Sequence, residues 1–240
     1  MADSVHDVVF LVDVDNTLLD NDRIVADLRE YLVREFGPDC AGLYWTRFEA
    51  LRQELGYADY LGALQRYRQD VAHRGVAAHA LLQVSSFLVD YPFRERVFPD
   101  AFEALAHLGR FGPTVILSDG DVVFQPRKIQ RSGLWRAVAG RVLVYVHKET
   151  MLDEIRQAFP ARHHVLVDDK PRLLAAFKAG WGADVTTVFP RQGHYALDAA
   201  EVAKHPPPDV VVERIGELAR TNIAGRTPPG ANHESHPATP

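Results

Sequence analysis

The second half of the chain alternates short apolar runs with amphipathic segments, and this alternation restricts the fold more than any other feature. Helical patterns recur from Pro99 onward, separated by runs rich in valine, leucine and isoleucine. Strands that alternate with helices of this length are typical of a parallel, doubly wound α/β sheet with right-handed crossovers. We predict strands in this half over residues 114–117, 142–146, 164–167, 185–189 and 210–212. The helices between and after them are predicted near residues 99–111, 126–133, 152–159, 171–178 and 215–218.

The first strand is separated from this region by a long helical segment. Residues 8–12 form a short, β-branched apolar run, which indicates a buried strand. Four apolar helix faces follow, and they end at Gly37, at Gly56, before Gly75 and at Pro92. About 70–80 residues with four such faces suffice for a small helical bundle.

The predicted domain organisation follows from this break in the pattern. We expect a core domain made of residues 1–19 and 97–220, with a helical cap inserted at 20–96. Residues 221–240 contain Gly, Pro, Thr, Asn and His without periodicity, and are predicted to be a disordered tail.

Composition limits the class of protein. The chain of 240 residues is 47% hydrophobic and 25% charged, as expected for a protein with a substantial core. The net charge of -5 and the lack of a basic stripe argue against nucleic-acid binding. A single cysteine, Cys40, excludes an intrachain disulfide and a multi-thiolate metal site. The N-terminus has no basic signal-peptide region and no apolar run could span a bilayer, so we expect a cytoplasmic protein without membrane contacts.

Two carboxylates follow the first predicted strand. Asp13 and Asp15 lie two residues apart, and Thr17 follows them. If this stretch is still extended, both carboxylates project from the same side of the chain. Two such charges repel by roughly 1–4 kcal/mol at about 4 Å, depending on the effective dielectric. A hard, oxygen-binding cation such as Mg²⁺ is therefore expected beside them, although an Asp-Asn turn is the simpler alternative.

The next predicted strands also end in polar residues. Ser118 follows the second strand, Lys148 the third, and Asp168 with Asp169 the fourth. Each has an ordinary alternative, as a helix cap, a solvated surface residue or a turn. Because the carboxyl ends of parallel strands share one edge, this edge would gather four carboxylates, a hydroxyl and an ammonium.

Together these residues resemble the four motifs of the haloacid dehalogenase-like (HAD) hydrolase superfamily. The first motif is residues 13–17, and the others are Ser118, Lys148 and Asp168-Asp169. The resemblance covers about residues 5–20 and 97–220, and it implies a Rossmann-like core. The helical insertion directly after the first motif resembles the C1 cap of this family. Such caps close over the active site and largely decide the substrate.

The resemblance implies phosphoryl transfer through a covalent aspartyl-phosphate. Asp13 would be the nucleophile and also a Mg²⁺ ligand. Asp15 would protonate the leaving oxygen and then activate water, and its backbone carbonyl would contribute to the metal site. Ser118 would donate a hydrogen bond to a phosphoryl oxygen, and Lys148 would offset the charge of Asp13 and the phosphoryl group.

The same resemblance assigns the remaining motif residues. Asp169 would bind Mg²⁺ directly, Asp168 would orient the waters of the metal, and Thr17 would support the loop around the nucleophile. Lys148 is followed by Glu149 where proline is frequent in the family, and Ser118 by Asp119 where asparagine is frequent. The two acidic residues of this second loop, Asp119 and Asp121, could contact waters of the metal or cap the next helix, and we expect them to cap the helix.

Four residues of the predicted cap are candidates for facing the substrate, although each also fits a solvated helix face: Arg23, Arg47, Arg52 and Tyr60. Trp45 is expected to pack rather than to serve as a stacking platform.

The resulting functional hypothesis is a Mg²⁺-dependent phosphatase that acts on a small phosphorylated metabolite. A hexose phosphomutase of the same superfamily, which keeps both aspartates of the first motif, is the nearest alternative. A 2-haloacid dehalogenase fits less well, because that chemistry needs neither the metal nor the acid, and this chain retains Asp15, Asp168 and Asp169. A non-catalytic binding or regulatory relative is the alternative from another class. The sequence indicates neither the particular substrate nor the oligomeric state.

Overall fold

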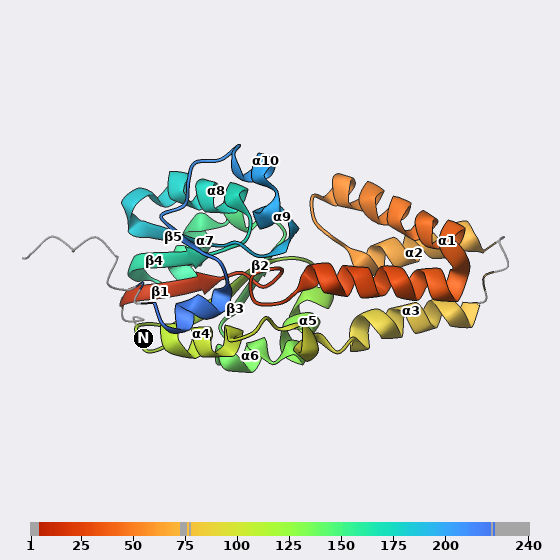
Figure 1. The fold of residues 1–240 in the computed structure, drawn as a ribbon, viewed down its shortest axis with the longest axis horizontal. Coiled ribbons are helices and arrows are strands. Elements are labelled where there is room, and N and C mark those ends of the chain that lie inside the picture. Colours follow the sequence, from red (N-terminus) through yellow and green to blue (C-terminus); the bar gives the residue numbers. More distant parts are fainter. Residues whose placement is uncertain (1–4, 73–75, 77, 222, 224–240) are drawn as a thin grey trace, which may run out of the picture.

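A six-stranded parallel sheet forms the centre of the protein, in the order β3-β2-β1-β4-β5-β6 (Figure 1). The structure is a computed structural model that describes residues 5–72, 76, 78–221 and 223. Every pair of neighbouring strands is parallel, so the predicted doubly wound α/β fold is confirmed. The strands are β1 (His6–Val12), β2 (Thr114–Asp119), β3 (Val142–Tyr145), β4 (Ala161–Val167), β5 (Val185–Pro190) and β6 (Val210–Val212).

Strand β1 lies between β2 and β4, and the direction of winding changes there. The chain adds β2 and β3 on one side of β1, and β4, β5 and β6 on the other. In the register of the sheet, Phe10 is paired with both Thr114 and Val165. In open α/β sheets, ligands bind beyond the carboxyl ends of the strands at such a switch point. The loop that follows β1 therefore occupies the position where a site is expected.

Helices cover both faces of the sheet, because adjacent side chains of a strand point to opposite faces. Val9 and Leu11 pack on one face against α7 and α8, whereas Phe10 and Val12 pack on the other against α4, α5 and α6. These helices are α4 (Ala101–Leu108), α5 (Phe124–Ser132), α6 (Leu134–Ala137), α7 (Leu152–Ala158) and α8 (Pro171–Trp181). Shorter elements are α9 (Gly193–Leu197), α10 (Ala199–Val202), and the 3-10 helices η1 (Phe93–Arg96), η2 (Lys148–Thr150), η3 (Gly182–Asp184) and η4 (Ile215–Ala219).

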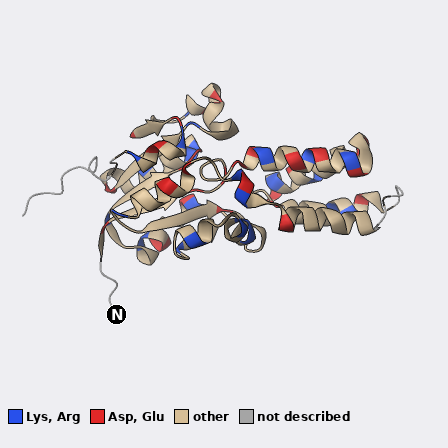
Figure 2. Cartoon of the chain, turned by 60° about the horizontal axis from the view of Figure 1, so that its bottom comes forward, with Lys and Arg blue, Asp and Glu red and all other residues tan. Residues whose placement is uncertain are grey.

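Three further helices lie together beyond the carboxyl end of β1 (Figure 1), and we call them the helical insert. They are α1 (Asn21–Leu55), α2 (Tyr60–Val71) and α3 (Ala78–Asp90). Helix α1 is interrupted at Gly37, whose φ of 77° and ψ of 165° are not helical, so the insert has the four helical segments that were predicted. Residues of both charge signs alternate along these helices (Figure 2). The exact domain limits at residues 20 and 96 stay a prediction.

Several predicted limits differ from the structure. Strand β2 continues through Asp119, because its ladder with β3 extends to the pair Asp119 and Tyr145, so Ser118 lies inside the strand and not after it. Helix α8 continues past Gly180 to Trp181, which is buried against Phe177 with ring centroids 5.1 Å apart. This packing outweighs the helix cost of about 1 kcal/mol for one glycine.

Other parts of the prediction concern the C-terminal region. Helices α9 and α10 were not predicted, because segments of five and four residues carry no apolar period. The final predicted helix is a 3-10 segment, η4. The predicted disordered tail lies outside the described residues except for Thr221 and Ile223. Within the described part of the chain, no helix is long and apolar enough to cross a membrane.

Candidate active site

The ammonium of Lys148 lies at the centre of the site and joins two other motif residues, Asp13 and Asp168. Lys148 begins η2 and is fully buried, and its Nζ lies 2.6 Å from Oδ1 of Asp13 and 2.7 Å from Oδ2 of Asp168. It also donates a hydrogen bond of 3.0 Å to the carbonyl of Leu117. Burial disfavours the charged amine, but the two carboxylates outweigh this effect and raise the pKa of Lys148. The lysine therefore stays an ammonium and compensates the buried carboxylates.

Three carboxylates gather beside this lysine in an arrangement that fits a metal ion. Asp13, Asp168 and Asp169 each offer an oxygen within 4.8 Å of the others. Oδ2 of Asp13 and both oxygens of Asp169 are buried and have no hydrogen-bond partner among the described residues. Burial raises the pKa of Asp168 to about 6, and burial together with the charge of Asp168 raises the pKa of Asp169 well above its ordinary value. Unpartnered carboxylate oxygens are the ligands that Mg²⁺ prefers, so the donor set fits this ion.

Thr17 connects the loops that follow β1 and β4. Its Oγ1 accepts a hydrogen bond of 3.1 Å from the backbone N–H of Asp169. Oδ1 of Asp168 in turn accepts a bond of 2.9 Å from the N–H of Lys170, at the start of α8. These bonds hold the first and last motifs at a fixed separation.

The carboxylate of Asp15 has different partners from that of Asp13. Nζ of Lys128 lies 2.6 Å from Oδ1 and 2.8 Å from Oδ2 of Asp15. Gln125 donates from Nε2 to Oδ2 of Asp15 at 3.2 Å and to Oγ of Ser118 at 2.8 Å. One glutamine of α5 thus connects the predicted acid and the predicted phosphate-binding hydroxyl.

The carboxylates of Asp13 and Asp15 do not lie in one cluster. Asp13 still donates its N–H to the carbonyl of Val167, Asp15 forms a bridge with Leu19, and the chain turns at Asn16, whose φ is 59°. The carboxylate of Asp15 lies outside the cluster of Asp13, Asp168 and Asp169 and faces a pocket instead.

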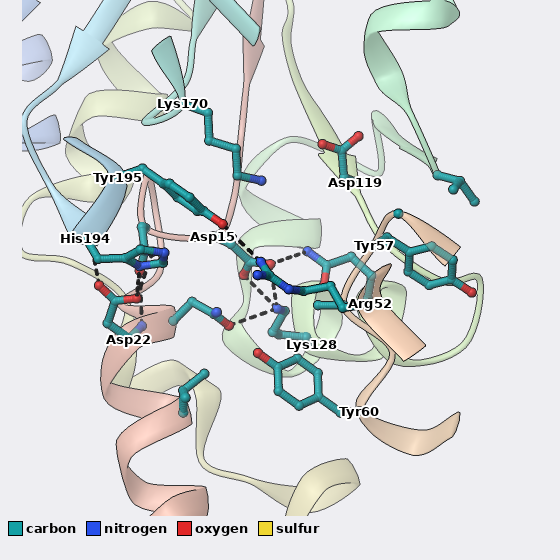
Figure 3. A pocket seen from close by; sticks show the side chains of 18 of the residues that line it. Asp15, Asp22, Arg52, Tyr57, Tyr60, Asp119, Lys128, Lys170, His194 and Tyr195 are labelled. Carbon is teal, nitrogen blue, oxygen red and sulfur yellow. Dashed lines mark hydrogen bonds and ion pairs between the residues drawn. The ribbon is translucent and has the colours of Figure 1, made fainter. Parts of the chain in front are cut away.

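That pocket has a volume of about 560 Å³ and lies between the sheet edge and the helical insert (Figure 3). Its described lining includes Arg52 and Tyr60 but neither Arg23 nor Arg47, so these two arginines agree with the alternative of a solvated helix face. Both are about half exposed and bind acidic residues within the insert: Arg23 binds Asp27 of the same helix at 2.9 Å, and Arg47 binds Asp70 of α2. Trp45 packs edge-on against Tyr44 and Phe48, in agreement with its predicted packing role.

The two acidic residues after Ser118 have different roles. Oδ1 of Asp121 accepts hydrogen bonds from the backbone N–H groups of Val123 and Phe124, so Asp121 caps the start of α5 as predicted. Asp119 does not, because it is still part of β2. Its Oδ1 accepts a bond of 2.9 Å from the N–H of Lys148, and so fixes the loop that carries the central lysine.

Sequence reasoning missed several residues of the pocket. Gln125 and Lys128 belong to a buried stripe of α5 with helical spacing, which continues through Ile129 and Ser132, but most of these residues are polar, so their spacing alone did not indicate burial. Around the predicted motifs, the pocket is also lined by Asn16, Asn21, Asp22, Lys170, His194 and Tyr195.

Helix α9 connects the core to the helical insert at the edge of this pocket. His194 binds Asp22 twice, through Nδ1 at 2.7 Å and through its N–H at 2.8 Å. Arg52 donates to the hydroxyl of Tyr195 at 3.3 Å (Figure 3). No motif indicates these contacts, because they join segments that are far apart in the sequence.

The fold and the site define a Rossmann-like α/β protein with a helical insert that faces an acidic, lysine-bearing site. A haloacid dehalogenase-like hydrolase from Burkholderia xenovorans LB400 is 64% identical to the chain and superposes with a TM-score of 0.84. The match covers 90% of the present chain and 99% of the Burkholderia protein. The chain therefore belongs to the haloacid dehalogenase-like hydrolases.

Two more distant structures share the fold. The HAD-hydrolase YfnB from Bacillus subtilis, bound to magnesium, is 16% identical, with a TM-score of 0.57 and coverage of 90% and 98% of the two chains. The L-2-haloacid dehalogenase from Xanthobacter autotrophicus, with chloropropionic acid covalently bound, is 19% identical, with a TM-score of 0.54 and the same coverage. No protein-family model and no curated protein matches the chain.

Proposed function

We propose that the protein is a Mg²⁺-dependent phosphatase that hydrolyses a small phosphorylated metabolite through an aspartyl-phosphate on Asp13. The observation that carries the proposal is the different placement of four carboxylates. Asp13, Asp168 and Asp169 form a buried cluster with unpartnered oxygens, whereas Asp15 opens onto the pocket. Phosphoryl transfer needs a nucleophile, cations on the phosphoryl oxygens and an acid for the leaving oxygen, and this arrangement provides each of them.

In the first step, an oxygen of Asp13 attacks phosphorus and the bond from phosphorus to the ester oxygen breaks. Lys148, which already binds Asp13 at 2.6 Å, offsets the negative charge of the nucleophile and the phosphoryl group. Ser118 binds a phosphoryl oxygen, with its hydroxyl oriented by the donor Nε2 of Gln125. The leaving oxygen receives a proton from Asp15.

In the second step, water attacks phosphorus, the bond from phosphorus to the Asp13 oxygen breaks to release phosphate and the Asp13 carboxylate, and Asp15 takes a proton from that water. Lys128 holds the Asp15 carboxylate through both oxygens, which keeps the group aimed at the reacting oxygen. Asp13, Asp168 and Asp169 would hold Mg²⁺, which supplies a positive charge to the phosphoryl oxygens when it is bound.

A dehalogenase and a phosphomutase remain the alternatives within the family. Dehalogenation attacks carbon and needs neither an acid nor a metal, which leaves Asp15 and the unpartnered oxygens of Asp169 without a role. The retention of these groups favours phosphoryl transfer over dehalogenation, and the substrate screen below distinguishes the phosphatase from the phosphomutase.

A substrate screen tests the proposal directly. Purified protein is assayed with a panel of phosphate esters and Mg²⁺ for phosphate release, with glucose 1-phosphate for isomerisation, and with 2-chloropropionate for chloride release. We expect phosphate release that EDTA abolishes and that Asp13→Asn eliminates. Chloride release that persists in EDTA, with no phosphate from any ester, would identify a dehalogenase instead.

The roles of Asp13 and Asp15 are distinguished by the kinetics of their variants with p-nitrophenyl phosphate, whose leaving anion needs little protonation. Asp15→Asn should still form the aspartyl-phosphate and then stall, giving a burst of nitrophenol. Asp13→Asn should give no burst. A phosphorylated peptide that lacks Asp13 would contradict the assigned nucleophile.

A further inference from the structure

The third lysine of the site, Lys170, differs from every other lysine of the chain. The sequence contains five lysines. Four of them bind a carboxylate: Lys128 with Asp15, Lys148 with Asp13 and Asp168, Lys178 with Asp209, and Lys204 with Glu201. Among the described residues, the ammonium of Lys170 makes no hydrogen bond or ion pair, and its contact is with the ring of Tyr195, 5.9 Å from the ring centre.

The backbone places this unpaired ammonium at the reacting end of the pocket. Lys170 directly follows Asp169, and its N–H is fixed by the bond to Oδ1 of Asp168. Pro171 then begins α8, which is anchored in the core, so the stem of Lys170 starts from a rigid position. Figure 3 shows its side chain extending into the pocket, on the side of Asp15 and Tyr195.

The charges of the site explain what an extra ammonium would do there. Asp13, Asp15, Asp168 and Asp169 are four acidic groups, and two lysines form ion pairs with them: Lys128 with Asp15, and Lys148 with Asp13 and Asp168. A phosphoryl dianion that enters this site adds two more negative charges. One divalent cation offsets only part of that charge, so an additional ammonium aimed into the pocket favours binding of the dianion.

We propose that Lys170 is a phosphoryl-binding residue, whose ammonium donates to a non-bridging oxygen of the substrate phosphate opposite Lys148 and Ser118. The inference rests on the proposed phosphatase function and adds to it a residue outside the four motifs. The predicted partner is the phosphoryl group itself and not a distant part of the substrate, because the lysine extends from the loop that carries the metal-site carboxylates. Inorganic phosphate, the product of the reaction, is therefore sufficient as a probe.

The test compares phosphate binding by wild type, Lys170→Met and Lys170→Arg, each with Mg²⁺. Calorimetry gives the Kd of inorganic phosphate, and competition against p-nitrophenyl phosphate gives its inhibition constant. Loss of one charged hydrogen bond should weaken phosphate binding by about 10- to 100-fold in Lys170→Met. Lys170→Arg, which keeps a cation, should recover most of the loss. Lys204→Met is the matched control, because it removes an exposed lysine that binds Glu201, and should leave the Kd unchanged.

The outcomes separate this inference from the proposed function. Phosphate binding by Lys170→Met within twofold of wild type, with esters still hydrolysed, overturns the inference and leaves the phosphatase standing. Phosphate binding that depends on Lys170 without hydrolysis of any ester supports the inference and contradicts the phosphatase. A wild-type protein that neither binds phosphate nor hydrolyses any ester overturns both. Thermal melting verifies the fold of each variant, and Lys170→Gln replaces Lys170→Met if the latter does not fold.

Discussion

Lys128 and Asp15 form a two-point ion pair at the edge of the pocket, with Nζ 2.6 Å from one carboxylate oxygen and 2.8 Å from the other. The lysine side chain is 2% exposed and that of the aspartate 25% exposed, so the pair joins the interior of α5 to the open pocket. The orientation of the predicted general acid therefore depends on a helix that carries none of the four motifs.

Removal of Lys128 should impair general acid catalysis by Asp15, although the carboxyl group of Asp15 itself remains. Lys128→Met leaves Asp15 without its main anchor, and we expect kcat for an alkyl phosphate to fall by about 10- to 100-fold, because a displaced catalytic group loses most of its effect. With p-nitrophenyl phosphate, the rate of the first step should fall less, because the leaving anion needs little protonation. Because both residues act as a unit, the effects of Lys128→Met and Asp15→Asn should not add in a double-mutant cycle. Additive losses in the steady-state kinetics would mean that Lys128 acts independently of Asp15.

The buried carboxylate cluster predicts a stabilising metal. At Mg²⁺ concentrations 100-fold above Kd, the free energy of unfolding should rise by about 2.7 kcal/mol, which corresponds to a Tm increase of about 5–10 °C for a chain of this size. Asp169→Asn should lose this increase along with activity, because it replaces a ligand whose oxygens have no other partner. Differential scanning calorimetry with and without EDTA measures both effects. Asp153→Asn, an exposed site on α7, is the control and should retain the shift.

The contact between the helical insert and the core depends on Gly56 at the end of α1. A Cβ at Gly56 would lie 2.6 Å from the ring of His147, which precedes the central lysine. We therefore expect Gly56→Ala to displace the insert and to lower kcat/KM by about 10- to 100-fold.

Gly37→Ala provides a matched control for this prediction. Gly37 also has a positive φ, 77°, but a Cβ there has no atom within 4 Å. Both variants carry backbone strain and should lose stability, of the order of 1 kcal/mol or more. Steady-state kinetics should show the loss of kcat/KM only in Gly56→Ala. Equal kinetic losses in the two variants would show that strain, and not the contact with His147, is responsible.

A polar network between α1 and residues 91–96, which connect the insert back to the core, predicts a specific pH dependence of stability. Asp27 accepts hydrogen bonds from the hydroxyl of Tyr91 and from Arg96, the latter at 3.0 Å, and pairs with Arg23. Partial burial opposes ionisation, but these partners outweigh it and lower the pKa of Asp27 below its ordinary 3.8. A carboxyl whose pKa is lower in the folded state stabilises the fold above its unfolded pKa, and this stabilisation is lost as the pH falls through the folded value.

Asp27→Asn should therefore destabilise the protein at pH 7 by about 1–3 kcal/mol, the range for hydrogen bonds to a charged group. The difference from wild type should shrink as the pH is lowered below about 4. Urea unfolding at several pH values measures it, with Asp39→Asn, an exposed residue of the same helix, as the control. A difference that is constant with pH would assign the loss to packing and not to charge.

The fold class and the position of the site follow from the amino-acid sequence alone. Periods of two and of about 3.6 residues separate strands from helices, and strands joined by helices must be parallel, so their carboxyl ends share an edge. For that reason Asp13, Lys148, Asp168 and Asp169 could be placed together from their positions at strand ends alone. The helical breaks at Gly37 and Gly56 were predictable as well, because glycine readily adopts the positive φ that is found at both positions.

Which helix faces line the site, in contrast, depends on how the helices pack in three dimensions. Gln125 and Lys128 lie on a largely polar helix, and nothing local determines whether that stripe meets water or Asp15. The direction of Lys170 depends on how α8 packs, and the selection of Arg52 and Tyr60 over Arg23 and Arg47 depends on how the helices of the insert pack on one another. Local sequence indicates approximately where a strand or helix lies, but side-chain partners across the pocket come from segments up to 172 residues apart, such as Asp22 and His194. Their meeting depends on the packing of whole elements, which no single stretch of sequence encodes.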